Sequence, residues 1–499
     1  MGAPKTSPKA APKTEESTTL ESLFDLDSKA NDISGATLLS PTSSEFAKDE
    51  LISKISSCTR VFTFTDPAES PSQQDLKRCR LAWILSAIRS TKKLLDDRVL
   101  ASLISMLSAN LFRQLPLPSL PSLPSDFLDN DCLAMVLAPS WPHLHIVYDI
   151  LGALVTHAKP KSLPGHIDHA FLLNLLGLFQ SEDPRERDRL KNVYHQLYSK
   201  LTDERSFMRR SMSNVFLRFA SDAERHSGIG ELLEIWGSII NGFAVPLKEE
   251  HRVFLARVLV PLHKSKWMPS YYQQLFYCVS QFVQKEPELG GVVLRGILRY
   301  WPVTNCHKEV LIIGELEDLV ESLCPSEFEK LAVPLCSQIA KCLSSCNSQV
   351  AERALYVWNN EQFVRMASRC MEKILPAIVQ GIEKNLSWHW SKSVQELTMS
   401  VKTMLEEMEP ELYSKCLQEL AHRESVAEQE EIKRKVRWER LERAAANNNC
   451  SNLQIVHVSP NNRSNPHTSS LLASRARRVI APAFHSSRNF GYGESKLFK

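Results

Sequence analysis

The stretch "SEDPRERDRLKNVYHQLYSKLTDER", residues 181–205, carries the pattern on which the fold prediction rests. Asp183 is a favourable N-cap, because its side chain can accept a hydrogen bond from a free backbone N–H. Pro184 suits the first helical position, and Glu186 falls three residues after the cap, as in a capping box. We therefore predict that an amphipathic helix begins here.

One face of this predicted helix is apolar. Its members recur at spacings of three and four residues and so form one line along the helix: Leu190, Val193, Leu197 and Leu201. At about 100° per residue, His195 lies roughly opposite this line and Tyr198 lies on its flank. Core packing does not explain His195. Two interpretations stay open: an incidental surface residue, or part of the wall of a groove that meets a ligand.

Segments of the same kind recur along the chain, separated by short breaks rich in Pro, Ser or Asn. Glycine is scarce and strand-like alternation is absent from these segments, so the pattern predicts an all-α protein. The helices come in pairs at a spacing of about 40 residues, which is typical of solenoids built from stacked helical hairpins. The clearest examples are residues 168–180, 228–243, 249–263, 270–284 and 328–343.

Both ends of the chain differ from this helical region. Residues 1–50 are rich in Pro, Ser, Thr, Lys and Ala, and we predict a disordered tail there. Residues 51–445 form the predicted solenoid domain. Residues 446–499 show little helix signal and end in a basic stretch, which is a solvated tail, a nuclear-import signal or an arm for an acidic partner.

Composition and motif content exclude several classes of function. The net charge is only +3, so the chain as a whole is not expected to bind nucleic acid. None of the 12 cysteines forms a CxxC pair, and we interpret them as reduced, mostly buried thiols of a cytoplasmic and nuclear protein. No segment reaches 18 apolar residues, so membrane insertion is not expected. No P-loop, GxGxxG, GxSxG or HExxH motif occurs, and we expect neither enzyme activity nor a cofactor or metal.

Three charged or histidine-rich clusters have simple structural interpretations. His143 and His145 lie in an apolar helical segment without metal partners at useful spacing. The acidic run at residues 314–321 reads as a solvated helix face or a partner contact. The mixed-charge run at residues 431–440 reads as an exposed helix or a nuclear-import signal.

A second site feature follows the break at Pro246. Lys248 and His251 are neighbours at a predicted helix start, which offers free N–H groups and a positive potential. Ile235 and Ile239, one turn apart on the preceding helix, offer apolar surface. If Arg205 converges with these residues, the chain holds a short-peptide site with apolar pockets and a cationic clamp for an acidic side chain.

Several unusual phrases closely resemble the B-prime family of regulatory subunits of protein phosphatase type 2A. The likeness runs from about residue 58 to residue 440 and includes "WPHLHIVYD" (141–149), "SEDPRERDRLKNVYHQLY" (181–198), "NGFAVPLKEEH" (241–251), "YWPVTNCHKEV" (300–310) and "QVAERALYVWNNE" (349–361). The resemblance implies an α-solenoid of about eight degenerate HEAT-like repeats. It also implies a non-catalytic subunit that binds the phosphatase scaffold and catalytic subunits and recruits substrates. A helical-repeat scaffolding or transport adaptor without phosphatase association is the alternative.

Members of the family bind short LxxIxE motifs in a groove between repeats. The resemblance carries this role to positions of this chain that match the family pattern: His195, Tyr198, Arg205, Ile235, Ile239, Lys248 and His251. One matched position departs, since the family's "LHRIYGKF" is here "YHQLYSKL", with Gln196 in place of arginine. We expect the motif class to be kept, and affinity or dependence on phosphorylation to be reduced.

Overall fold

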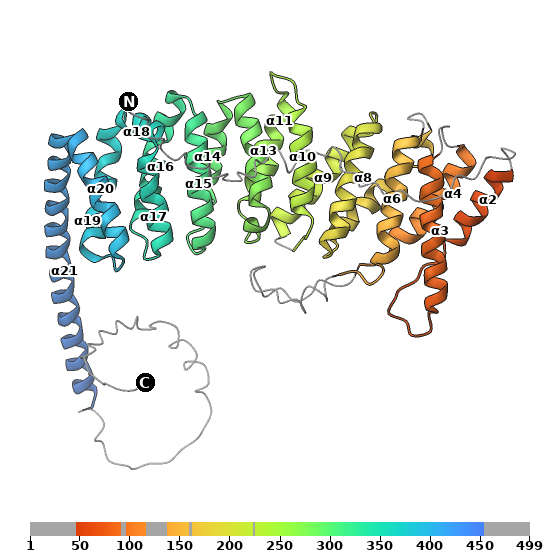
Figure 1. Cartoon of the computed structure of the whole chain (residues 1–499). Coiled ribbons are helices and arrows are strands. Elements are labelled where there is room, and N and C mark those ends of the chain that lie inside the picture. Colours follow the sequence, from red (N-terminus) through yellow and green to blue (C-terminus); the bar gives the residue numbers. More distant parts are fainter. Residues whose placement is uncertain (1–45, 91–95, 116–136, 159–161, 223–224, 454–499) are drawn as a thin grey trace, which may run out of the picture. The chain divides into compact units, whose positions relative to one another are not determined.

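A computed structural model describes residues 46–90, 96–115, 137–158, 162–222 and 225–453 (Figure 1). Within these ranges the chain is helical and no strand occurs, as predicted. The first half contains α2 (Phe46–Ser57), α3 (Pro71–Ser90), α4 (Asp97–Leu111), α6 (Trp141–His157), η2 (Leu163–Gly165), α7 (His169–Gly177), η3 (Leu178–Gln180), α8 (Pro184–Lys200), α9 (Arg205–Asp222) and α10 (Ile229–Asn241).

The second half continues the same pattern. It contains α11 (Glu249–Phe254), a π-helical turn η4 (Leu255–Leu259), α12 (Val260–Leu262), η5 (Met268–Tyr271), α13 (Tyr272–Lys285), α14 (Leu289–Arg299), α15 (Cys306–Ser322), α16 (Pro325–Leu343), α17 (Ser348–Tyr356), η6 (Val357–Asn359), α18 (Glu361–Ser368), α19 (Met371–Trp388), α20 (Lys392–Met408) and α21 (Pro410–Leu453).

The helices form two layers, in which each helix packs on the equivalent helix of the next hairpin. One layer runs α3, α6, α8, α10, α13, α15, α17, α20, with every consecutive pair in contact. The other runs α7, α9, α12, α14, α16, α19 in the same way. Because each hairpin contacts mainly its chain neighbours, the core is continuous along the stack and the fold is the predicted α-solenoid (Figure 1).

Hydrogen bonds between neighbouring repeats reveal the period directly. Lys191 Nζ donates to Glu234 across 43 residues, and the Tyr272 hydroxyl donates to the Leu311 carbonyl across 39 residues. The Asn385 side chain donates to the Leu343 carbonyl across 42 residues. These separations agree with the repeat length of about 40 residues expected from the sequence.

Helix α8 follows its predicted pattern with one exception. The Asp183 carboxylate accepts a hydrogen bond from the Arg185 N–H at 2.9 Å, which confirms the N-cap. The four residues of the predicted apolar line, Leu190, Val193, Leu197 and Leu201, are all buried. The capping-box role of Glu186 is wrong, because its side chain is fully buried and turned into the protein.

The Glu186 carboxylate is held by three other side chains. Arg113 donates to both oxygens at 2.8 and 2.7 Å, and the Tyr148 hydroxyl donates at 2.9 Å. The Ser181 hydroxyl donates at 2.6 Å. A carboxylate with this many donors would lose more by turning outward to the helix start than it would gain there. Glu186 therefore ties α8 to α6 and to the segment after α4.

The boundaries of the helical domain in the structure differ from the predicted ones. The compact helical unit ends at Ala421, and the rest of α21 belongs to a second unit. Helix α21 continues to Leu453, so the absence of helix predicted from residue 446 is wrong for 446–453. The run at 431–440 is exposed helix, as predicted. Helix α2 begins at Phe46, so the disorder predicted for residues 1–50 is wrong for 46–50. Both predicted tails otherwise lie outside the described residues.

The histidines, the acidic run and the cysteines noted in the sequence mostly contribute to packing inside the protein. His143 is buried and its Nε2 lies 2.9 Å from the Gln74 carbonyl oxygen. The acidic run at 314–321 is not uniformly solvated, because Glu315 is fully buried against His263. The cysteines of the described residues are free thiols, most of them buried. Across those residues, we find no helix with the length and apolar character needed to span a membrane.

Candidate functional site

Helices α8 and α10 are joined by two ion pairs that follow one another by one helical turn. Arg187 Nε lies 2.7 Å from Glu231 Oε1, and Lys191 Nζ lies 2.6 Å from Glu234 Oε2. The pKa of Lys191 is raised: burial works against its charge, but the hydrogen bond to Glu234 and the charge of that carboxylate outweigh it. These pairs hold the first half of the α8–α10 interface at a fixed spacing.

The next turn carries no third ion pair. His195 follows Lys191 by four residues and Ser238 follows Glu234 by four, so both continue the same helix faces. Burial lowers the pKa of His195, so its imidazole is neutral at pH 7. Ile235 and Ile239 lie on the α10 side and are 2% and 6% exposed. The charged interface thus gives way to an apolar one at His195.

Tyr198 marks the far end of this apolar part. Its hydroxyl accepts a hydrogen bond from Arg209 Nη1 at 2.9 Å, and the Arg205 guanidinium lies 5.4 Å from the centre of its ring. Arg205 also donates from Nε to the Tyr198 carbonyl at 3.0 Å and from Nη2 to the Ser199 carbonyl at 2.9 Å. Arg205 is therefore fixed on the C-terminal end of α8, with three of its five N–H donors left over.

Lys248 and His251 stand at the start of α11. Lys248 is the exposed N-cap residue, and the His251 ring stacks on Phe243 with 3.7 Å between ring centres. The pKa of His251 is lowered, mainly by burial; Glu250 opposes this shift, while the charges of Arg209 and Lys248 add to it. Nδ1 of His251 is buried without a partner among the described residues. Arg209 and Lys248 thus both lie within electrostatic range of His251.

We refer to these residues as the α8–α10 face. It comprises His195, Tyr198, Arg205, Arg209, Ile235, Ile239, Lys248 and His251. Arg209, which bonds to Tyr198 and acts on His251, was not predicted from the sequence. The available signal was its position one turn after Arg205, because residues four apart share a helix face.

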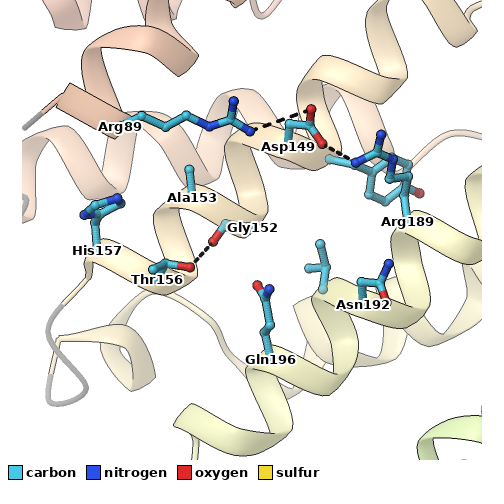
Figure 2. A pocket seen from close by; sticks show the side chains of 11 residues that line it. Arg89, Asp149, Gly152, Ala153, Thr156, His157, Arg189, Asn192 and Gln196 are labelled. Carbon is cyan, nitrogen blue, oxygen red and sulfur yellow. Dashed lines mark hydrogen bonds and ion pairs between the residues drawn. The ribbon is translucent and has the colours of Figure 1, made fainter. Parts of the chain in front are cut away.

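Gln196 does not lie with this group. Its exposed side chain lines a cavity between α8 and α6, on the other flank of α8 (Figure 2). Consecutive helix residues point about 100° apart, so a neighbour of His195 faces a different helix. The predicted role of Gln196 in motif binding stays a prediction.

The α8–α10 face combines nearly buried apolar side chains with a cationic end. Its middle is formed by isoleucines and aromatic rings, and its end holds arginine, lysine and imidazole donors with unused capacity. Such a surface suits an extended peptide with apolar side chains followed by a carboxylate. Within the described part of the chain, no cluster of three or more His, Cys, Asp or Glu side chains could hold a metal ion.

Comparison with known proteins gives a consistent result. The model of the family described as "Protein phosphatase 2A regulatory B subunit (B56 family)" matches residues 37–445. The chain is 45% identical over 395 residues to the B' beta isoform of the 57 kDa regulatory subunit of protein phosphatase 2A from Arabidopsis thaliana, covering 79% of each chain. It is 44% identical over 411 residues to the B' kappa isoform of that plant, covering 82% of each. Against the B' kappa isoform of Oryza sativa subsp. japonica, identity is 42% over 397 residues, or 79% of this chain and 78% of the relative.

Proposed function

Because the chain belongs to the B56 family of protein phosphatase 2A regulatory B subunits, we propose that it binds the phosphatase scaffold and catalytic subunits and recruits substrate proteins to them. Its role is regulatory rather than catalytic, as the names of its relatives state for those proteins. Recruitment raises the local concentration of a substrate near a tethered catalytic site, which increases the rate of dephosphorylation without new chemistry. We place this activity in the cytoplasm and the nucleus.

We further propose that substrates bind through LxxIxE-like motifs on the α8–α10 face. The apolar motif residues pack on Ile235, Ile239 and the ring of Tyr198. The motif glutamate meets the cationic end formed by Arg209, Lys248 and His251, with Arg205 beside them. The cationic end supports the assignment. Ile235 and Ile239 are 2% and 6% exposed, so the motif contacts only the small part of their surface that is open.

The observation that carries the proposal is the change of interface character at His195. Two turns of ion pairs close the junction between α8 and α10, and the third turn leaves it apolar and flanked by cations. A fully paired interface would have no donors or apolar surface left for a ligand. Here the cationic side chains keep unused donors, whereas Ile235 and Ile239 expose only 2% and 6% of their surface.

The binding free energy expected for such a peptide is modest. A micromolar peptide complex corresponds to about −8 kcal/mol. A hydrogen bond to a charged group contributes about 1.5–3 kcal/mol, so one or two carboxylate contacts form a large share of the total. Charge reversal at the cationic end should therefore abolish binding.

Two separate measurements test the proposal. In the first, the full-length chain is mixed with purified scaffold and catalytic subunits and analysed by size-exclusion chromatography. We expect a heterotrimer, and separate elution at micromolar concentration would contradict the assembly proposal.

In the second measurement, calorimetry with an LxxIxE peptide should show binding that Arg205→Glu abolishes. Equal affinity in that variant would exclude the motif-site assignment.

A further inference from the structure

Helix α3 carries an exposed apolar face at the N-terminal end of the stack. Leu76 is 50% exposed and Trp83 is 41% exposed, and the exposed Cys79 lies between them. These residues are spaced by three and by four, so they follow one another along one side of the helix. We refer to these three residues together with Arg80 as the α3 face. It shares no residue with the α8–α10 face.

The position of α3 in the stack explains why this face is open. Helix α3 is the first helix of its layer, and it packs on α6 (Figure 1). The only described element before it is α2, which has 12 residues and lies against both α3 and α4. Lys54 Nζ of α2 lies 3.6 Å from the centre of the Trp83 ring, at the border of the face. The ends of solenoids need a cap with a polar outer surface, and α2 covers α3 only in part.

Arg80 adds an available cation to this face. It follows Leu76 by four residues and precedes Trp83 by three, and it is partly buried. Among the described residues it has neither a hydrogen bond nor an ion pair. A guanidinium group in this state can form a bidentate bond to a carboxylate. The α3 face therefore suits a ligand that combines apolar side chains with carboxylates.

A segment with this chemistry lies in the same chain, ahead of α2. Residues 15–27 read "EESTTLESLFDLD" and contain five acidic residues and no Lys or Arg. Leu20, Leu23 and Phe24 have the spacing of one face of a helix. The segment precedes residues 37–445, which match the family model, so the family match does not account for it.

The connection to α2 keeps this segment within reach of the α3 face. Phe46, the first residue of α2, precedes Lys54 by eight residues and is therefore about 12 Å from it along the helix. Residues 28–45 form the connection, and a random-coil chain of that length spans about 23 Å. Such a tether gives an effective concentration on the order of millimolar, so even a weak contact covers the face in most molecules.

We propose that residues 15–27 bind to the α3 face of the same molecule. The apolar side chains of the segment cover Leu76, Cys79 and Trp83, and one of its carboxylates pairs with Arg80. The bound segment completes the end of the stack and gives it an acidic outer surface. A second copy of the chain that docked through its own α3 face would instead bring two arginines together without a carboxylate.

The test measures how fast N-ethylmaleimide alkylates Cys79 in the full-length chain, by mass spectrometry of the peptide that contains this residue. A bound segment shields the Cys79 thiol. Leu23→Asp with Phe24→Asp should release the segment and speed alkylation about tenfold, the factor expected when about nine in ten molecules are covered.

Leu38→Asp with Leu39→Asp is the matched control, because it places two new carboxylates in the same part of the chain but outside residues 15–27. This variant should leave the rate at Cys79 unchanged. Cys346, an exposed thiol between α16 and α17, is the internal reference and should react equally in every variant.

Trp83→Ser tests the other side of the contact. Trp83 is exposed, so its replacement should not impair folding, and it should speed alkylation of Cys79 as the change at Leu23 and Phe24 does. The combined variant should react little faster than either one, because both changes remove the same contact. Fully additive effects would show that Trp83 shields the thiol without the segment, and would contradict the proposal.

Three further results would overturn the proposal. The first is an unchanged rate at Cys79 in the variant of Leu23 and Phe24, or an equal increase in the control variant. The second is shielding that grows with protein concentration, which would assign the face to a second copy of the chain. The third is shielding that appears only after purified scaffold and catalytic subunits are added, which would assign it to the phosphatase complex. None of these readouts depends on peptide binding at the α8–α10 face.

Discussion

Arg209 Nη1 donates a hydrogen bond to the hydroxyl oxygen of Tyr198 over 2.9 Å, and the charge of the same arginine lowers the pKa of His251. One side chain of α9 thus connects the end of α8 with the start of α11. Arg209 therefore bonds to the aromatic part of the α8–α10 face and acts electrostatically on its cationic part, although burial is the main cause of the lowered pKa of His251.

Replacing Arg209 should weaken motif binding strongly. Arg209→Gln removes a charged donor worth about 1.5–3 kcal/mol, which corresponds to a loss of about tenfold to a hundredfold in affinity. Tyr198→Phe keeps the ring and should cost less, about 1 kcal/mol. Peptide titration by calorimetry measures both. Arg210→Gln removes the exposed neighbouring charge and should have little effect; equal losses in Arg209→Gln and Arg210→Gln would show only a general loss of positive potential.

A third ion pair should close the site. His195→Lys together with Ser238→Glu continues the series of Arg187–Glu231 and Lys191–Glu234 by one turn. We expect the double variant to lose peptide binding while its melting temperature stays within a few degrees of the original. Ser238→Glu alone serves as the control, since it adds a carboxylate without a lysine to hold it across the gap. Full peptide affinity in the folded double variant would show that this turn is not part of the site.

Motif affinity should depend on pH through His251. Its pKa is lowered in the free chain, mainly by burial. A motif glutamate placed nearby raises that pKa, so binding takes up a proton. The resulting gain is present at pH values below the pKa of the bound state and is lost as pH rises through it. Peptide affinity measured from pH 8 down to about 5.5 should therefore increase, before the motif glutamate itself titrates near about 4.3.

The control for this prediction is His251→Gln, which keeps a polar side chain but cannot titrate. Its affinity profile should be flat over the same range. A flat profile in the unmodified chain would mean that the motif glutamate does not approach the imidazole.

The buried carboxylate of Glu186 should be important for stability. Glu186→Gln leaves Arg113, whose side chain is only 21% exposed, without its ion-pair partner. Breaking such a pair costs about 3–5 kcal/mol, which should lower the thermal midpoint by several degrees. Glu249→Gln, at a side chain that is 78% exposed, is the comparison and should change stability by less than about 0.5 kcal/mol. Similar midpoints for the two variants would contradict the role assigned to Glu186.

The sequence predicted the fold well, because helical periodicity and repeat spacing are local properties. The cap at Asp183 and the buried stripe of α8 depend only on neighbouring residues, and both are confirmed. Glu186 was misinterpreted because its partner Arg113 lies 73 residues away. No local pattern shows that a better partner competes with the helix start.

Less of the candidate site than of the fold could be predicted from the sequence. Among the matched residues, Arg205 contacts Tyr198 and the charge of Lys248 acts on His251, and these relations depend on three-dimensional contacts. Arg205 uses two of its donors on carbonyl oxygens of α8, while Arg209 reaches the Tyr198 hydroxyl. Gln196 was included through the resemblance to the family pattern, although helical geometry turns it toward α6.

The paired charges between α8 and α10 also bear on how the whole stack deforms. A solenoid bends at the junctions between repeats, because each repeat contacts only its neighbours. The four side chains of the two ion pairs are 12–18% exposed, so salt screens them weakly. This junction is therefore stiffer than one held by apolar packing alone. Bending of the stack should therefore change the distance between α8 and α10 little.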